Sequence, residues 1–96
     1  MEIVLWIETK NYGKVREILL RDPLVSLASI TFREGKIMAK EGWYCYISGL
    51  ESQCAKALEL TKDLAKEIKD REKEEVIKKI KEEESRATEG FGVLFG

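Results

Sequence analysis

The chain has 96 residues, enough for about one domain with a modest core but not for a core and a deep catalytic cleft. Its 17 basic and 18 acidic residues leave a formal net charge of -1, so the electrostatic field is mixed in sign and a dedicated nucleic-acid-binding protein is disfavoured. Charged residues make up 36% of the chain, and Asn11 and Gln53 are its only amides, a composition typical of thermophile proteins. We therefore expect a thermophilic, archaeal source.

Cys45 and Cys54 are the only cysteines, and they form no CxxC pair. Two sulfurs without histidine make an incomplete zinc site, and a cytosolic disulfide is unusual, so we interpret both as structural thiols, with Cys54 in the core. The N-terminal segment is too short for a signal peptide, and no apolar run approaches the roughly 20 residues of a membrane-spanning helix. We expect a soluble cytoplasmic protein with no metal and no cofactor.

Two elements are predicted in the first 21 residues. The apolar run over residues 3–7 is continuous rather than alternating, which favours a strand covered on both sides. Val15, Ile18 and Leu19 then recur at helical spacing until Asp22-Pro23 ends the run, which predicts a helix over residues 12–21.

From residue 24 the apolar period changes to two, which indicates a strand with Ala28, Ile30 and Phe32 on one face. Glu34-Gly35 predicts a tight hairpin. We interpret the returning segment, residues 37–47, as one strand with a bulge near Gly42, while two short strands remain an alternative.

A single charged helix is predicted over residues 51–86. Its first half carries an apolar stripe at steps of three and four residues, which suits a helix lying on a sheet (Cys54, Ala57, Leu58, Thr61, Leu64, Ala65 and Ile68). In its second half the stripe thins to Val76, Ile77 and Ile80. Residues 1–86 are therefore expected to form one α+β domain, followed by an apolar, glycine-rich tail over residues 87–96.

The tail contains Phe91, Leu94 and Phe95, which we expect to be buried. It returns either as a fourth strand of the chain's own sheet, in a βαββαβ ferredoxin-like order, or against another chain. The predicted fold class is α+β, with a βαββα unit, a long C-terminal helix and a ferredoxin-like or Pcc-like two-layer arrangement.

Trp43, Tyr44 and Tyr46 have two interpretations. Aromatic side chains on a sheet face stack on unpaired bases in several RNA-binding modules. Alternatively, they are core residues with a solvent-facing tyrosine pair. We favour the second interpretation, because no RNP-like motif accompanies them and nearby cations are few (Arg33, Lys36 and Lys40).

Candidate catalytic groups are weak. Glu51, Glu59 and Asp63 lie along one side of the predicted long helix, where a solvated face is the default interpretation. The chain has no histidine, the usual base near pH 7. We predict no catalytic residues and no enzymatic activity of the chain by itself.

The charged helix admits two interpretations. It is either a solvated surface laced by weak ion pairs, or its line of Ile68, Val76, Ile77 and Ile80 is a seam completed by another subunit. We favour the seam, because a chain this short offers little else to cover these side chains.

The order strand, helix, hairpin and long helix resembles the small Pcc subunits of the KEOPS complex, which makes the threonylcarbamoyl-adenosine modification of tRNA. The resemblance spans residues 15–68 and is carried by a short set of motifs: Ser29-Ile30-Thr31-Phe32, Gly35-Lys36-Ile37, Ser52 and Ala57-Leu58. Glu59 and Lys62-Asp63 depart from the family pattern of Arg and Asn-Ser, so the chain looks like a diverged accessory paralogue.

This resemblance implies a non-catalytic subunit that dimerises with a Pcc-like partner through its hairpin edge and long helix and touches tRNA only indirectly. The alternative is a self-associating ferredoxin-like domain that binds a small ligand or RNA at its dimer interface. The predicted interface comprises Leu58, Leu64, Ala65, Ile68, Ile77, Phe91, Leu94 and Phe95.

Overall fold

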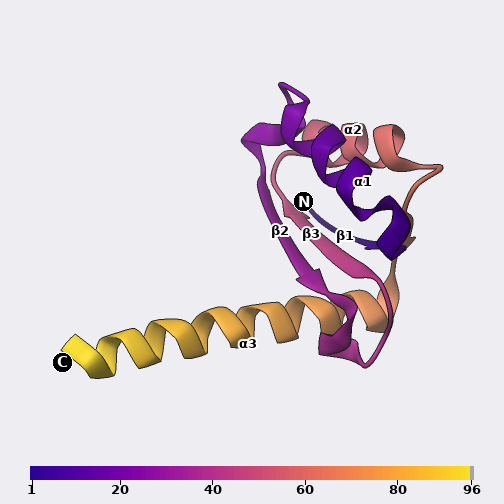
Figure 1. The fold of residues 1–96 in the computed structure, drawn as a ribbon. Helices are drawn as coiled ribbons and strands as arrows, with labels where there is room; N and C mark the ends of the chain where they lie inside the picture. The colour runs from indigo at the N-terminus through magenta and orange to yellow at the C-terminus, as the bar shows by residue number, and fades with distance from the viewer. Residues whose placement is uncertain (96) are drawn as a thin grey trace.

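The computed structural model describes the backbone of residues 1–95 and the side chains of residues 1–85. Four strands, three helices and two short 3-10 helices follow one another along these residues (Figure 1). In chain order they are β1 (Glu2–Ile7), α1 (Thr9–Arg21), η1 (Val25–Leu27), β2 (Ser29–Glu34), η2 (Gly35–Met38), β3 (Trp43–Ser48), α2 (Glu51–Thr61), β4 (Lys66–Ile68) and α3 (Asp70–Phe95).

The strands form one antiparallel sheet in the order β2-β3-β1-β4. Helices α1 and α2 lie together on one face of this sheet, and α3 crosses the other face (Figure 1). The predicted α+β class and βαββα unit with a long C-terminal helix are confirmed. With β4 included, the order of elements up to Ile68 is the βαββαβ order of ferredoxin-like domains.

The larger core lies between the sheet and helices α1 and α2. Strand β1 contributes alternate residues to it, and Val15 and Leu19 face it from α1. Its buried members are Ile3, Leu5, Ile7, Val15, Leu19, Val25, Cys45, Ile47, Cys54 and Ala57. Both cysteines are free and buried, as expected of structural thiols.

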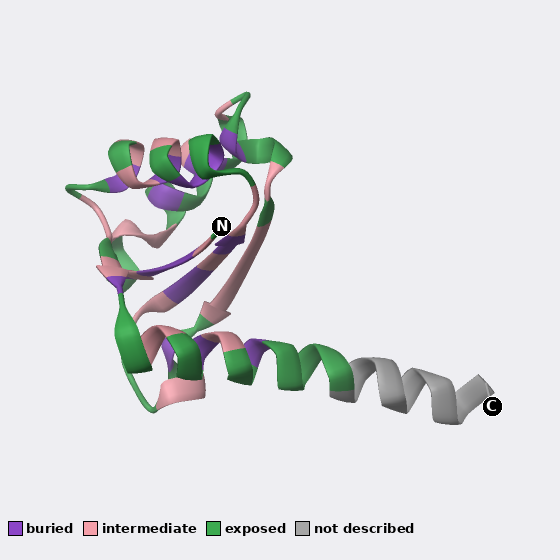
Figure 2. Ribbon diagram, turned by 180° about the vertical axis from the view of Figure 1, so that it is seen from behind, coloured by how far each residue is buried: buried purple, intermediate pink, exposed green. Residues whose placement is uncertain are grey.

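A smaller core lies on the opposite face, beneath α3 (Figure 2). Val76 and Ile80 are fully buried against Val4 of β1, Tyr44 of β3 and Ile68 of β4. Strand β1 is therefore covered on both sides, as its continuous apolar run predicts. The reason for expecting a seam with another subunit is that nothing else in the chain could cover Ile68, Val76 and Ile80. That reason is wrong, because Ile68 of β4 and Val76 and Ile80 of α3 pack together within the chain.

The prediction of one helix over residues 51–86 is wrong. Helix α2 ends at Thr61, and the chain turns and enters β4, where Lys66 and Ile68 pair with Trp6 and Val4. A second break follows at Asp70, which has a positive φ of 59°. Strand pairing with a segment about sixty residues away thus overrides the local helical pattern, as tertiary context often does.

The fourth strand comes from residues 66–68 and not from the tail. Helix α3 continues to Phe95, so the backbone over residues 90–95 is helical and does not form a strand. The side chains of Phe91, Leu94 and Phe95 lie outside the described residues, and their predicted burial stays a prediction.

The connection between β2 and β3 is longer than a tight hairpin. Residues 35–38 form η2, and β3 begins only at Trp43, so the bulged strand over residues 37–47 is also wrong. Ile37 and Met38 pack from η2 against the α3-side core instead. Gly42 makes this path possible, because its φ is +83° and a Cβ there would lie 2.5 Å from the Ile7 carbonyl oxygen.

Candidate protein interface

Strand β2 is an open edge of the sheet: it pairs with β3, and no other described strand pairs with it. Directly beyond the last paired residues, the Gly35 N–H donates to the Gly42 carbonyl at 2.7 Å. Hydrogen-bonded pairs alternate along an antiparallel ladder, so the odd-numbered residues of β2 bond to β3. The backbone N–H and C=O groups of Ile30 and Phe32 therefore point outward from the sheet.

The side chains of Ile30 and Phe32 hold this edge against the larger core. The Phe32 ring meets Tyr12 of α1 edge to face, with ring centroids 5.6 Å apart, and Tyr12 stacks on Trp43 at 4.0 Å. These contacts fix the strand, so its outward backbone groups are presented in a nearly fixed geometry. The Phe32 C=O accepts from Arg33 Nη1 at 2.9 Å, whereas the outward groups of Ile30 and the Phe32 N–H form a template for a strand from another chain.

Helix α3 reaches the same edge from the opposite face. Arg33 of β2 donates through Nε to Glu83 at 3.1 Å, and the Tyr44 hydroxyl donates to Glu72 at 2.9 Å. The Tyr44 hydroxyl, and then Lys40, hold the pKa of the Glu72 carboxyl below its ordinary value. A strand added to β2 would therefore extend a sheet that carries helices on both faces.

The predicted interface residues do not form one surface. Leu58, Leu64 and Ala65 are half-buried and pack on the larger core, on the α1 and α2 side of the sheet. Ile68 is 4% exposed and belongs to the α3-side core. Whether the exposed parts of these side chains contact a partner stays a prediction.

Ile77 is half-buried and lines a shallow groove of about 610 Å³ along α3. The groove follows one stripe of the helix and is closed on its other side by Glu2 of β1. Its remaining lining residues are Glu74, Lys78, Lys81, Glu82 and Ser85. Charges of both signs surround one aliphatic side chain, which suits a mixed protein surface better than a small ligand.

Sequence reasoning missed an apolar end of the domain. Ser29 pairs with Ser48, so η1, which precedes β2, and the start of α2, which follows β3, lie at the same end of the sheet. The large apolar side chains that are exposed among the described residues all come from this end (Met1, Leu20, Leu24, Leu27 and Leu50). Leu50 could have been predicted from the sequence, because it lies between β3 and the apolar stripe of the following helix.

The exposure of the remaining candidate residues (aromatic residues, carboxylates and cysteines) tests the roles predicted for them. Tyr44 is fully buried beneath α3, so the expected solvent-facing tyrosine pair is wrong, whereas Trp43 packs on the larger core. Glu51, Glu59 and Asp63 are exposed on the surface. Burial raises the pKa of the Cys45 and Cys54 thiols, which keeps them protonated and poorly nucleophilic at neutral pH.

Comparisons with protein-family models, with curated proteins and with solved structures give no match to this chain. Within the described residues, no helix is long and apolar enough to cross a membrane. The described side chains also contain no group of three Cys, Asp or Glu residues placed to hold a metal ion.

Proposed function

We propose that this chain is a non-catalytic small subunit that binds a partner protein by accepting a partner strand along β2. The resemblance to Pcc subunits suggests a Pcc-like partner in a cytoplasmic complex that makes threonylcarbamoyl-adenosine in tRNA. In that setting the chain acts by occlusion: it covers one face of the partner, blocks further dimerisation, and leaves the other face for the catalytic subunit.

The observation that carries this proposal is the open edge of β2, where the backbone groups of Ile30 and the N–H of Phe32 point outward and pair with no described strand. The Phe32 C=O accepts from Arg33 Nη1 at 2.9 Å, and a partner strand would take the place of this side chain. Exposed edges are usually blunted by a charge pointing into the edge, a proline or a covering loop. The central residue of this edge is Thr31, which is uncharged, and the Arg33 guanidinium is held by Glu83 and by the Phe32 C=O. The edge is therefore chemically compatible with added strands.

A second copy of the chain is the other candidate partner, and the strand itself favours it. Two β2 strands related by a two-fold axis can pair with Thr31 opposite Thr31 of the second copy. Ile30 then lies opposite Phe32, an aromatic and β-branched pair of the kind that stabilises sheets, and Arg33 lies opposite Ser29. This register places no like charges opposite each other, so self-association is the alternative function of the same edge.

Co-elution on a size-exclusion column at micromolar concentration tests the proposal, using the chain and the Pcc-like protein of the same organism. Wild type is expected to co-elute, and Thr31→Lys is expected to weaken association at least about tenfold, because a charge in the middle of the edge opposes strand addition. Ser52→Lys is the matched control, since it replaces another hydroxyl residue with lysine at an exposed position on α2.

Light scattering on the chain alone separates the two partners. A monomer that co-elutes with the Pcc-like protein supports the accessory-subunit function. A tight homodimer that captures no partner and is split by Thr31→Lys supports self-association. Association that is equally strong in wild type and Thr31→Lys would contradict both forms of the proposal.

A further inference from the structure

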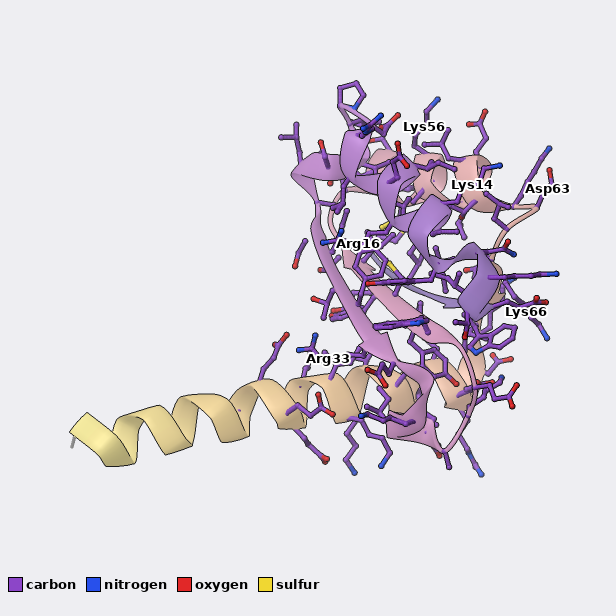
Figure 3. The ribbon with its side chains drawn as sticks, viewed as in Figure 1. Lys14, Arg16, Arg33, Lys56, Asp63 and Lys66 are labelled. Atoms are coloured by element: carbon purple, nitrogen blue, oxygen red, sulfur yellow. The ribbon has the colours of Figure 1, made fainter. Side chains whose placement is uncertain are left out.

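One row of side chains crosses the whole α3-side face of the sheet. Arg33 of β2 lies opposite Tyr44 of β3, Tyr44 lies opposite Trp6 of β1, and Trp6 lies opposite Lys66 of β4. The row thus reads cation, aromatic, aromatic, cation. Figure 3 shows the residues at its two ends, Arg33 and Lys66, at opposite edges of the sheet.

The two aromatic residues occupy the central strands, on the face away from α1 and α2. RNA-binding modules with a four-stranded sheet stack two or three unpaired bases on aromatic side chains of a sheet face. Tyr46 lies on the same face, two residues along β3 from Tyr44, and a third cation, Lys40, sits over the Trp6 ring with its Nζ 5.0 Å from the ring centroid. Stacking surfaces bordered by cations are what single-stranded nucleic acid requires.

Helix α3 presents carboxylates to this row. Glu72 accepts from the Tyr44 hydroxyl at 2.9 Å and from Lys40 Nζ at 3.4 Å, while Glu83 accepts from Arg33. These are positions at which phosphate oxygens of a bound strand would meet the same donors. The apolar contacts of α3 rest on few side chains, of which Val76 and Ile80 are fully buried.

We infer that the row Arg33–Tyr44–Trp6–Lys66 is a binding surface for single-stranded RNA, and that α3 covers it in an autoinhibitory contact in which Glu72 and Glu83 occupy the phosphate positions. RNA binds when α3 is displaced, with bases on Trp6 and Tyr44 and phosphates on Arg33, Lys40 and Lys66. This surface shares Arg33 with β2, but it uses side chains on the α3-side face, whereas the proposed partner binding uses the outward backbone groups of β2.

The test is fluorescence anisotropy of a short fluorescein-labelled oligouridylate with full-length variants. Glu72→Gln combined with Glu83→Gln removes both carboxylates at nearly constant shape and is expected to tighten binding at least about tenfold over wild type. The matched control is Glu74→Gln with Glu82→Gln, which makes the same charge change on the groove side of α3. That control is expected to tighten RNA binding by less than about threefold, through the change in net charge alone.

Two further variants locate the site within the Glu72→Gln, Glu83→Gln background. Trp6→Ala is expected to weaken binding at least about fivefold through the loss of one stacked base. Lys66→Gln changes an exposed side chain, leaves the fold intact and reduces the dependence of binding on salt concentration. Far-UV circular dichroism checks the fold of each variant, and Lys66→Gln keeps the test valid if Trp6→Ala does not fold.

The inference is overturned if the Glu72→Gln, Glu83→Gln variant gains no more affinity than the Glu74→Gln, Glu82→Gln control. It is also overturned if the gain is unchanged by Lys66→Gln and by a folded Trp6→Ala variant. Val76→Asp gives a second route to the open state, because it removes an apolar anchor of α3 and leaves the row untouched. If this variant is folded with α3 displaced, it is expected to bind the oligouridylate more tightly than wild type, and failure to do so also counts against the inference.

Discussion

Replacing Ile80 with alanine tests whether α3 is part of the folded core. Ile80 is fully buried and packs with Val4, Tyr44 and Val76. Truncating a buried isoleucine to alanine costs about 2–5 kcal/mol, from lost transfer free energy and from the cavity left behind. Because α3 covers only one face and can partly settle into the space, we expect a loss of about 3 kcal/mol.

That loss is large for a chain of this size, since the free energy of unfolding of a small domain is about 5–15 kcal/mol. At roughly 4–8 °C per kcal/mol, it lowers Tm by roughly 12–24 °C. Urea unfolding followed by far-UV circular dichroism measures the change in free energy, and a thermal scan measures Tm.

Ile77→Ala is the control, because it makes the same truncation three residues earlier in α3, where the side chain is only half-buried. We expect it to cost about 1 kcal/mol. If Ile80→Ala and Ile77→Ala destabilise the protein equally, within about 0.5 kcal/mol, α3 does not dock on the sheet through Ile80 and the reasoning fails.

Two further substitutions and the titration of a tyrosine test other contacts of the sheet. Tyr44→Phe should cost about 1 kcal/mol by removing the donor to Glu72. Glu72 has a lowered pKa when folded, so its stabilising contribution is present above its ordinary pKa of 4.5 and is lost as the pH falls further; urea titrations should show less of this loss in Tyr44→Phe. Gly42→Ala should lower Tm by roughly 10 °C or more, because a Cβ at φ +83° meets the Ile7 carbonyl. Burial, and then the hydrogen bond to Glu2, raises the pKa of Tyr46 to about 12, so ultraviolet titration should show one tyrosine ionising near that pH, with its stabilisation present below pH 10 and lost as the pH rises through 12.

Local patterns were sufficient for three elements in the first part of the chain. The continuous run of β1, the helical spacing of Val15 and Leu19, and the alternation of β2 each predict an element that the structure contains. The loop before β3 was less predictable, because Ile37 and Met38 fit a strand pattern and are instead used by η2. Apolar residues can pack on the same core from a strand or from a 3-10 helix.

The candidate site was predictable only in outline. The order of strands predicts that β2 lies at an edge of the sheet. Which of its backbone groups point outward depends on which residues form hydrogen-bonded pairs with β3, and the Gly35–Gly42 hydrogen bond decides this. The cation and aromatic row was not visible in the sequence, because Trp6 and Lys66 meet only through strand register. The groove at Ile77 likewise depends on Glu2 lying beside α3.

The sequence by itself determined the α+β class, the first strand and helix, and the need for something to cover Val76 and Ile80. Only the tertiary structure decided what covers them. Residues 62–65 carry no glycine or proline, so no local signal ends the helix there. The pairing of β4 with β1 breaks it, turns the chain to the other face of the sheet and lays α3 on Val4 and Tyr44, because pairing and burial between distant segments outweigh the small helical preference of a few residues.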